Sequence, residues 1–255
     1  MSERRIAVIG TGNVATHLIR WFTEAKLMVT SVYTRNPSSH QGFGVKLRDS
    51  LDYRGESCDF IVIATKDDVI GEISKSLSNT GKAIIVHTSG SVPLSALKKT
   101  HFAGTGVLYP LQTLQKGRKM SLANVPFLIE GDHSSSLDHM SALCKAAGFN
   151  HQAASTQERL SYHLSAVISS NFTNHLLYFA EKFLNDQQLN AGLLRPLMHE
   201  TVQKAFDMGA FNSQTGPARR ADQQTIQRHQ ALLKDPELKA LYEMISASIL
   251  STYQS

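Results

Sequence analysis

The first half of the chain alternates short apolar runs with stretches in which apolar residues recur at helical spacing. Six of the runs are rich in β-branched residues and predict strands. The run Phe60–Ala64 is apolar at every position, which is typical of a strand buried on both faces of a parallel sheet. The alternation predicts an α/β fold with a doubly wound Rossmann sheet. The predicted strands are Arg5–Ile9, Met28–Tyr33, Asp59–Thr65, Ala83–His87, Gly106–Tyr109 and Pro126–Glu130.

The pattern changes near Ala153, after which no strand signal recurs. A stretch from Gln157 to about Asn185 contains neither proline nor glycine and carries apolar residues at helical spacing. In the next stretch, Pro196 marks either a kink or a helix start. We therefore expect a Rossmann domain over residues 1–153 and an all-α C-terminal domain over residues 154–255. The further helical stretches are Asn190–Met208, Ala218–Leu233 and Pro236–Thr252.

Composition narrows the class of protein. The chain has 255 residues, of which 42% are hydrophobic, so it can bury a sizeable core. Two cysteines suggest neither a disulfide framework nor a metal site, and no apolar run has the length of a membrane helix or a signal-peptide core. We expect a cytoplasmic protein. The net charge of +5 is scattered, which suits a small polyanionic ligand and gives only weak support to nucleic-acid binding.

The strongest motif is G-x-G-x-x-A, formed by Gly10, Gly12 and Ala15. It follows a predicted strand directly and opens a predicted helix, Thr16–Glu24, as a dinucleotide-binding fingerprint requires. Gly10 permits a sharp turn, Gly12 lets a pyrophosphate approach the backbone, and Ala15 allows close packing of helix and strand. The helix N-terminus then offers N–H groups to the anion.

The end of the second strand indicates which dinucleotide binds. An Asp or Glu there would bind the ribose hydroxyls of NAD, but this chain has Thr34 and Arg35. Thr34 can donate a hydrogen bond to a 2′-phosphate, and the Arg35 guanidinium can pair with it or stack on the adenine. We expect NADP(H). The alternative is that Arg35 is an ordinary solvated arginine.

Two further strand ends are expected to reach the same crevice, because ligands bind at the carboxyl ends of such strands. Thr65 and Lys66 would border the adenosine half, and Ser89 and Gly90 would lie near the nicotinamide. The residues expected to bind the cofactor are Gly10, Thr11, Gly12, Asn13, Val14, Thr34, Arg35, Thr65, Lys66, Ser89 and Gly90.

Several segments together resemble a known family. They are the N-terminal fingerprint, Val86–Gly90, Tyr109–Thr113, Pro126–Glu130, the helical stretch Tyr162–Asn174, and Gln214–Ala218 with Arg220 and Asp222. The chain resembles the Rossmann-like NADP oxidoreductases that carry a C-terminal domain of unknown function (DUF2520 type). More distantly it is similar to pyrroline-5-carboxylate reductases, F420-dependent NADP reductases, and 6-phosphogluconate and β-hydroxyacid dehydrogenases. The resemblance implies a helical domain that closes over the nicotinamide and often pairs two subunits.

The long helical stretch carries the candidate catalytic residue, His163. On an ideal helix Ser170 and Asn174 lie within about 40° of His163, and Asn171 lies about 80° away. A histidine can supply the proton that accompanies hydride transfer, and either asparagine can hold a substrate oxygen. The β-hydroxyacid dehydrogenases use a lysine on the equivalent helix, but here none precedes Lys182. The alternative is that His163 serves only in helix packing.

Other polar residues are candidates for binding the substrate. Arg220 could clamp an acidic group and Asp222 could orient it, although a capped helix start with a structural ion pair explains both equally well. His199–Glu200 fits a surface pair better than a metal site, and we expect no metal. The candidate substrate-binding residues are Tyr109, Gln112, Thr215, Gly216, Arg220 and Asp222.

The sequence therefore predicts an NADP(H)-dependent oxidoreductase acting on a small carbonyl, imine or hydroxy acid. The alternative is a non-catalytic NADP(H)-binding or redox-sensing protein with a helical interaction domain. We also expect a homodimer built through the C-terminal helices, and a substrate site between the two domains.

Overall fold

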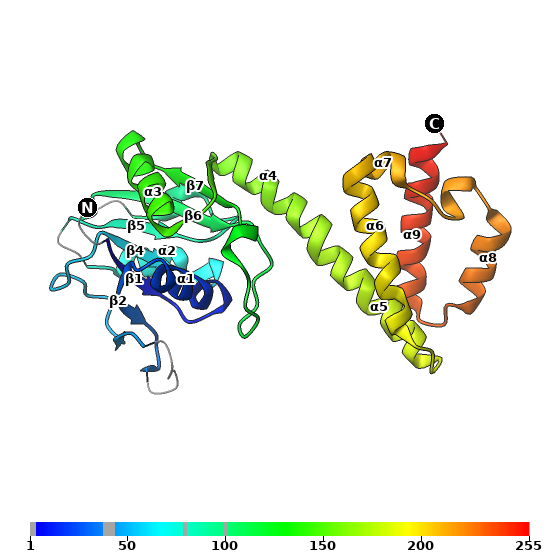
Figure 1. Cartoon of the computed structure of the whole chain (residues 1–255), viewed down its shortest axis with the longest axis horizontal. Helices are drawn as coiled ribbons and strands as arrows, with labels where there is room; N and C mark the ends of the chain where they lie inside the picture. The colour runs from blue at the N-terminus through cyan, green and yellow to red at the C-terminus, as the bar shows by residue number, and fades with distance from the viewer. Residues whose placement is uncertain (1–3, 38–43, 79–80, 99–100, 255) are drawn as a thin grey trace. The chain divides into compact units, whose positions relative to one another are not determined.

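A computed structural model describes residues 4–37, 44–78, 81–98 and 101–254 of the chain. These residues form two compact units, which divide between Asn171 and Phe172 (Figure 1). The first unit holds a sheet with helices on both faces, and the second contains helices. The α/β fold class expected from the sequence, with a helical C-terminal region, is confirmed.

The sheet of the first unit runs in the order β3-β2-β1-β4-β5-β6-β7-β8. Its neighbours are parallel from β3 to β6, while β7 runs antiparallel to β6 and parallel to β8. The strands β2 and β3 lie on one side of β1, and β4 and the strands after it lie on the other. The strand order therefore reverses between β1 and β4, which is the switch point where ligands bind in such sheets. The strands are β1 (Arg5–Ile9), β2 (Met28–Tyr33), β3 (Leu47–Arg48), β4 (Phe60–Ile63), β5 (Ile84–His87), β6 (Gly104–Pro110), β7 (Phe127–Gly131) and β8 (His151–Ala153).

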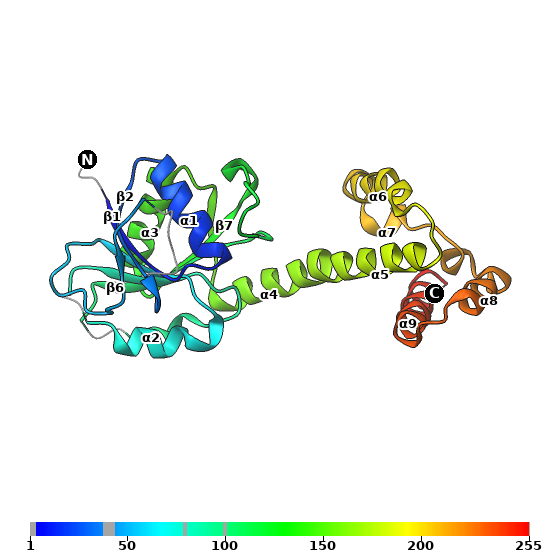
Figure 2. The same cartoon turned by 90° about the horizontal axis from the view of Figure 1, so that it is seen from below.

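Helices cover both faces of the sheet, as Figure 2 shows. Helices α1 (Asn13–Glu24) and α3 (Ser134–Ala147) pack on one face, and α2 (Ile70–Ser76) packs on the other. Successive side chains of β4 enter opposite cores: Val62 joins the α1 side and Ile63 the α2 side. The uninterrupted apolar pattern of the strands is thus explained by burial on both faces.

The long helical stretch predicted from Gln157 is interrupted in its middle. Helix α4 (Thr156–Ala166) begins at Ser155, which forms a capping box with Glu158. A π-helical segment, η5 (Val167–Phe172), then precedes α5 (Thr173–Asp186). The compact first unit includes α4, so it extends beyond the boundary expected at residue 153. The reason is that α4 is hydrogen-bonded to loops of the sheet, as described below.

The second unit contains α5 and the helices that follow it. Pro196 lies in the first turn of α6 and therefore marks a helix start rather than a kink. Asp222 and Asp235 cap the next long helices with their carboxylates. None of the described helices combines the length and apolar character needed to cross a membrane. The helices after α5 are α6 (Leu194–Met208), α7 (Ala210–Ser213), α8 (Gln223–Leu232) and α9 (Pro236–Tyr253).

Candidate cofactor and active site

The turn between β1 and α1 is built around glycine. Gly10 has a φ of +119°, and a Cβ on it would collide with the Ala64 carbonyl oxygen. Ala15 is completely buried, so α1 lies close against the sheet. At Gly12, by contrast, no atom lies within 4 Å of the position that a Cβ would take. The bare backbone of Gly12 leaves the space that an approaching pyrophosphate needs.

The first turn of α1 is suited to an anion. Gly12 occupies the N-cap without a side-chain hydrogen bond, and no acidic residue lies in the first turn. The partial positive charge of the helix terminus is therefore not neutralised by this helix itself. The Asn13 side chain accepts a hydrogen bond from the Lys116 N–H at 2.9 Å, and Val14 packs against the core. Asn13 and Val14 are thus placed to contact a ligand mainly through their backbone.

The end of β2 presents Thr34 and Arg35 one after the other. Thr34 is 7% exposed, and its backbone N–H donates to the Arg48 carbonyl at 2.9 Å, which fixes it beside β3. Arg35 is exposed. A buried hydroxyl followed by a solvent-facing guanidinium is an arrangement that can bind a 2′-phosphate from two sides.

The loops after β4 and β5 are joined by hydrogen bonds. Asp67 accepts from the hydroxyls of Ser89 and Ser91, each at 2.7 Å. The Ser89 hydroxyl is engaged in this way and its N–H donates to His87 Nδ1 at 3.2 Å, so both of these groups are already used within the fold. Thr65 is partly buried and Lys66 is exposed beside this link. Sequence reasoning did not single out Asp67, because its partners lie more than twenty residues away along the chain.

The side chain of His163 packs over Gly90 at the end of β5. Its Nδ1 lies 3.0 Å from the Tyr109 hydroxyl oxygen, and the two rings meet edge to face with centroids 5.8 Å apart. A Cβ on Gly90 would lie 2.6 Å from His163 Nδ1 and 2.8 Å from Tyr109 Cζ. Only glycine fits under this pair. The structure thus brings together three residues that the sequence assigned to different roles.

Burial shifts the pKa values of two groups here, His87 beside the pair and Tyr109 within it. Desolvation lowers the pKa of His87 to about 4, and the positive charge of Arg159 contributes. Burial likewise raises the pKa of Tyr109. His87 is completely buried and its Nδ1 accepts the Ser89 N–H, so this ring is neutral near pH 7 and is enclosed by the fold. His163 is the histidine that contacts the strand-end glycine.

The π-helical segment changes which residues share a helix face with His163. A π-helix closes i to i+5 hydrogen bonds, with about 4.4 residues per turn, so each residue advances by only about 80°. Four such steps from Val167 carry Asn171 onto the face of His163, instead of about 80° away from it as an ideal α-helix predicts. Asn171 is exposed. The ideal-helix projection was therefore wrong beyond Val167, and Asn171 replaces Ser170 as the neighbour on that face.

Some candidate residues are engaged in local structure. The Gln112 side chain donates to the Asn124 carbonyl and accepts from the Thr113 N–H, so its amide stabilises its own loop. Asp222 accepts from the Thr225 N–H at 3.0 Å and from the Thr225 hydroxyl at 2.7 Å. Asp222 is thus the N-cap of α8, in agreement with the capped helix start given as the alternative for it.

The remaining candidates belong to the second unit. Thr215 and Arg220 are exposed, and Gly216 has a φ of +104°, which favours glycine there. Asn174 is exposed on α5. A role for these four residues at the substrate stays a prediction, as does a substrate site between the domains. No cluster of metal-ligating side chains occurs among the residues that the structure describes.

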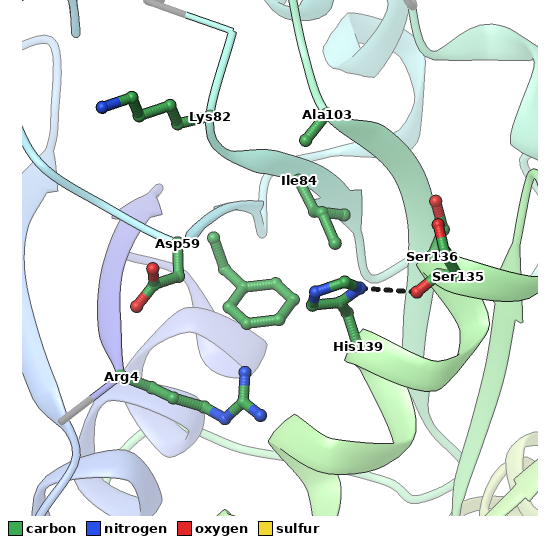
Figure 3. Close-up of a pocket in the computed structure, with 9 residues that line it drawn as sticks. Arg4, Asp59, Lys82, Ile84, Ala103, Ser135, Ser136 and His139 are labelled. Atoms are coloured by element: carbon green, nitrogen blue, oxygen red, sulfur yellow. Dashed lines mark hydrogen bonds between the residues drawn. The ribbon is translucent and has the colours of Figure 1, made fainter. Parts of the chain in front are cut away.

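A cavity of about 380 Å³ lies at the other end of the parallel strands (Figure 3). Arg4 lies just before β1, Asp59 before β4 and Lys82 before β5, so the cavity opens at the amino ends of these strands. His139 reaches into it and is hydrogen-bonded to the Ser135 carbonyl. Because the glycine turn and His163 lie at the carboxyl ends, this cavity is separate from the candidate cofactor site.

Two family models match the chain. Residues 5–90 match the family described as NADP oxidoreductase, coenzyme F420-dependent, and residues 125–249 match a domain of unknown function, DUF2520. The first match covers the glycine turn and the loops after β2, β4 and β5. The second covers Glu130, α4, η5 and the helices after it. Both matches agree with the resemblance seen in the motifs.

Solved structures share the fold over nearly the whole chain. A provisionally assigned NADP oxidoreductase from Bacteroides fragilis is 29% identical, with 98% of each chain covered and a TM-score of 0.86. A Thermotoga maritima protein is 22% identical over 98% of each chain, with a TM-score of 0.69. Plasmodium falciparum pyrroline carboxylate reductase, solved with NADP bound, is 14% identical, covers 100% of this chain and 94% of its own, and has a TM-score of 0.57. The last two show the fold alone. No curated protein matches the chain.

Proposed function

We propose, from the premise that the chain belongs to the NADP oxidoreductases with a C-terminal DUF2520 domain, that it transfers hydride between NADP(H) and a small carbonyl, imine or hydroxy acid. The observation that carries the proposal is the contact of His163 and Tyr109 over Gly90. It supports a proton-carrying imidazole at the strand end where the nicotinamide of such proteins is expected.

The residues present fit NADP(H). Gly12 leaves open space at the N-terminus of α1, which suits the pyrophosphate. Thr34 and Arg35 suit the 2′-phosphate, and the loop at Ser89 and Gly90 suits the nicotinamide end through the Gly90 backbone. When bound, NADP(H) supplies or accepts the hydride, which protein side chains cannot do.

His163 holds or moves the accompanying proton. Its Nδ1 is engaged with the Tyr109 hydroxyl, so Nε2 is the nitrogen left to exchange a proton with the substrate oxygen or nitrogen. Tyr109 fixes the orientation of the ring, in the way that a partner group orients the catalytic histidine of other enzymes. Asn171, which shares this helix face through the π-helical segment, can hold a substrate oxygen.

Turnover by a His163→Ala variant tests this proposal. The assay follows NADPH oxidation with a panel of small ketones, imines and 2-oxo acids. Loss of a general acid typically costs about 100- to 10,000-fold in rate, and NADPH affinity should stay near that of the wild type. His139→Ala is the control, because His139 lies at the opposite end of the strands. Full activity in His163→Ala would show that His163 only packs.

The cofactor preference has its own test. Arg35→Ala should reduce the preference for NADPH over NADH by about ten-fold, because an exposed guanidinium–phosphate pair is lost. Arg54→Ala, which removes an exposed arginine paired with Asp52, should leave the preference unchanged. Calorimetric titration of both cofactors measures the ratio, and an unaltered ratio in Arg35→Ala would remove Arg35 from the 2′-phosphate site.

We also propose that the protein is a homodimer through its second unit. Large apolar side chains are exposed there, among them Leu193 at 76% and Phe206 at 82%. Apolar surface on this scale is ordinarily covered in solution. A second copy of the chain is the partner that resemblance to the family implies.

A further inference from the structure

Arg159 is a completely buried arginine on the first turns of α4. Its Nη1 donates to three carbonyls of one loop, those of Ser89 at 3.0 Å, Gly90 at 3.0 Å and Val92 at 2.9 Å. Its Nη2 donates to the Glu130 carboxylate at 2.9 Å. One guanidinium therefore joins the loop after β5, the strand β7 and the helix that carries His163.

The surroundings of Glu130 complete this network. The Thr156 hydroxyl donates to both Glu130 oxygens, at 2.7 Å and 3.0 Å. Removing an ion pair from water is costly, and replacing such a pair with apolar side chains is often neutral or stabilising. Arg159 Nε even lacks a hydrogen-bond partner among the described residues. A gain in stability therefore explains this buried network poorly. The geometry that the network imposes on the loop after β5 explains it better.

The imposed geometry concerns the peptide groups of the loop. In a planar trans peptide the C=O and the following N–H point in opposite directions. Because the Ser89 carbonyl faces Arg159, the Gly90 N–H points away from it. Gly90 carries no side chain, and His163 and Tyr109 occupy the place where a Cβ would stand. The loop thus offers a backbone donor beside the proposed proton carrier.

The same guanidinium sets the place of His163. Arg159 and His163 are four residues apart on α4, so they share a helix face. Anchoring one to the loop after β5 therefore fixes where the other meets Gly90 and Tyr109. A lone arginine in a helical sequence pattern is ordinarily solvent-exposed, which is why the sequence did not single it out.

We propose that Arg159 is a positioning residue, which holds the Ser89–Val92 loop in the shape that binds the nicotinamide end of NADP(H) and sets His163 beside it. This inference rests on the proposed function. The amide carbonyl of the nicotinamide is the acceptor that the Gly90 N–H suits. The adenosine half is bound elsewhere, by the turn at Gly12 and by Thr34–Arg35, and does not depend on Arg159.

The test separates the two halves of the cofactor. Arg159→Lys keeps the positive charge near Glu130 but loses the planar fork, and binding of NADPH and of 2′,5′-ADP is measured by calorimetry. We expect NADPH affinity to fall by about ten-fold or more, as for loss of a well-placed hydrogen bond, and 2′,5′-ADP affinity to stay within about two-fold. Equal losses for both ligands, or no loss, would overturn the inference.

A matched control is Arg20→Lys. Arg20 also donates to a loop carbonyl, that of Met120 at 3.1 Å, but it lies on α1. Its NADPH and 2′,5′-ADP affinities should both stay near the wild-type values. If instead it shows the same selective loss of NADPH affinity as Arg159→Lys, the effect is not specific to the loop after β5 and the inference fails.

A second variant covers the case in which Arg159→Lys does not fold. Glu130→Gln keeps one acceptor oxygen for Nη2 but removes the charge and the second acceptor oxygen, and a smaller loss confined to NADPH is expected. Loss for neither ligand or for both overturns the inference. Failure of the wild-type protein to bind NADPH at all would instead overturn the proposed function, which keeps the two outcomes distinct.

Discussion

The two units differ in what holds them together. In the first, apolar side chains fill two cores, one on each face of the sheet, and the single tryptophan, Trp21, is 1% exposed. In the second, the only buried apolar residues among those described are Phe179, Ala218 and Ile226. Its exposed large apolar residues are Phe172, Leu176, Tyr178, Leu189, Leu193, Leu197, Val202, Phe206, Met208, Phe211, Leu232, Met244 and Ile245.

A segment can therefore have regular helices without having a buried apolar core. The helices of the second unit are marked by their caps, with Asp222 and Asp235 at the N-termini of α8 and α9. A small set of helices that buries so little apolar surface gains little stability from its own packing. We therefore expect the first unit to depend on its internal contacts, and the second on a covering partner.

Substitution of Gly10 gives the largest expected effect and probes the first unit. Gly10→Ala places a Cβ against the Ala64 carbonyl at a φ of +119°. Strain of about 1 to 3 kcal/mol and overpacking of about 1 to 3 kcal/mol should together lower the free energy of unfolding by about 2 to 6 kcal/mol. Denaturation followed by Trp21 fluorescence measures it.

Gly12→Ala is the matched control. No atom lies within 4 Å of the new Cβ, so the free energy of unfolding should change by less than about 1 kcal/mol. NADPH affinity should nevertheless fall, because the methyl group occupies the path of the pyrophosphate. An unchanged stability in Gly10→Ala would mean that the turn adapts, and the contrast between the two glycines would be lost.

Much of this fold was predictable because a strand buried on both faces has an uninterrupted apolar sequence. The run Phe60–Ile63 is apolar throughout since each side chain enters a core, and the strands predicted from such runs overlap the observed ones. The strands β3 and β8 were missed. They have two and three residues, and none of these is fully buried, so no apolar pattern marks them.

The candidate site was predictable only in part. The glycine turn has a local sequence signature, and the structure gives Gly10 and Gly12 the geometry that this signature requires. Arg159 and Asp67 act through partners distant in the chain, for which one sequence carries no signal. The π-helical segment was also invisible, because the same residues suit an α-helix, and it moved Asn171 relative to His163.

Acid sensitivity is the second prediction, and it again concerns the first unit. Burial lowers the pKa of His87 to about 4, below its ordinary value of 6.5. The unfolded chain therefore binds a proton more readily than the folded one between these values. The stability contributed by neutral His87 is complete above pH 6.5 and is lost as pH falls towards 4. The loss amounts to about 3 kcal/mol.

Unfolding curves at a series of pH values, followed at Trp21, check this prediction. His87→Gln should flatten the decline between pH 6.5 and 4, even where it lowers stability overall. His139→Gln should decline as the wild type does, because His139 is exposed. A wild-type curve without any decline across this range would show that His87 is protonated without cost in the fold.

The smallest expected effect probes the second unit, at Phe206. Phe206 is 82% exposed on α6, and if a second copy covers this surface, Phe206→Glu buries an unpaired carboxylate in the interface. Truncation or charging of an aromatic anchor costs about 2 kcal/mol, so the dimer should dissociate at protein concentrations roughly thirty-fold higher. Sedimentation at several concentrations measures the shift.

Thr201→Glu separates this effect from that of added charge alone. Thr201 is exposed on the same helix, about 140° around it from Phe206, so it adds the same negative charge on another face. We expect its dimer to survive. Trp21 fluorescence reports the unfolding of the first unit, because Trp21 lies there. If the first unit depends on its own core and the second on a partner, this unfolding should be nearly unchanged in Phe206→Glu. A wild-type protein that sediments as a monomer at micromolar concentration would contradict the dimer. Equal dissociation in both variants would show that added negative charge disrupts the dimer, and not the loss of an apolar contact of Phe206.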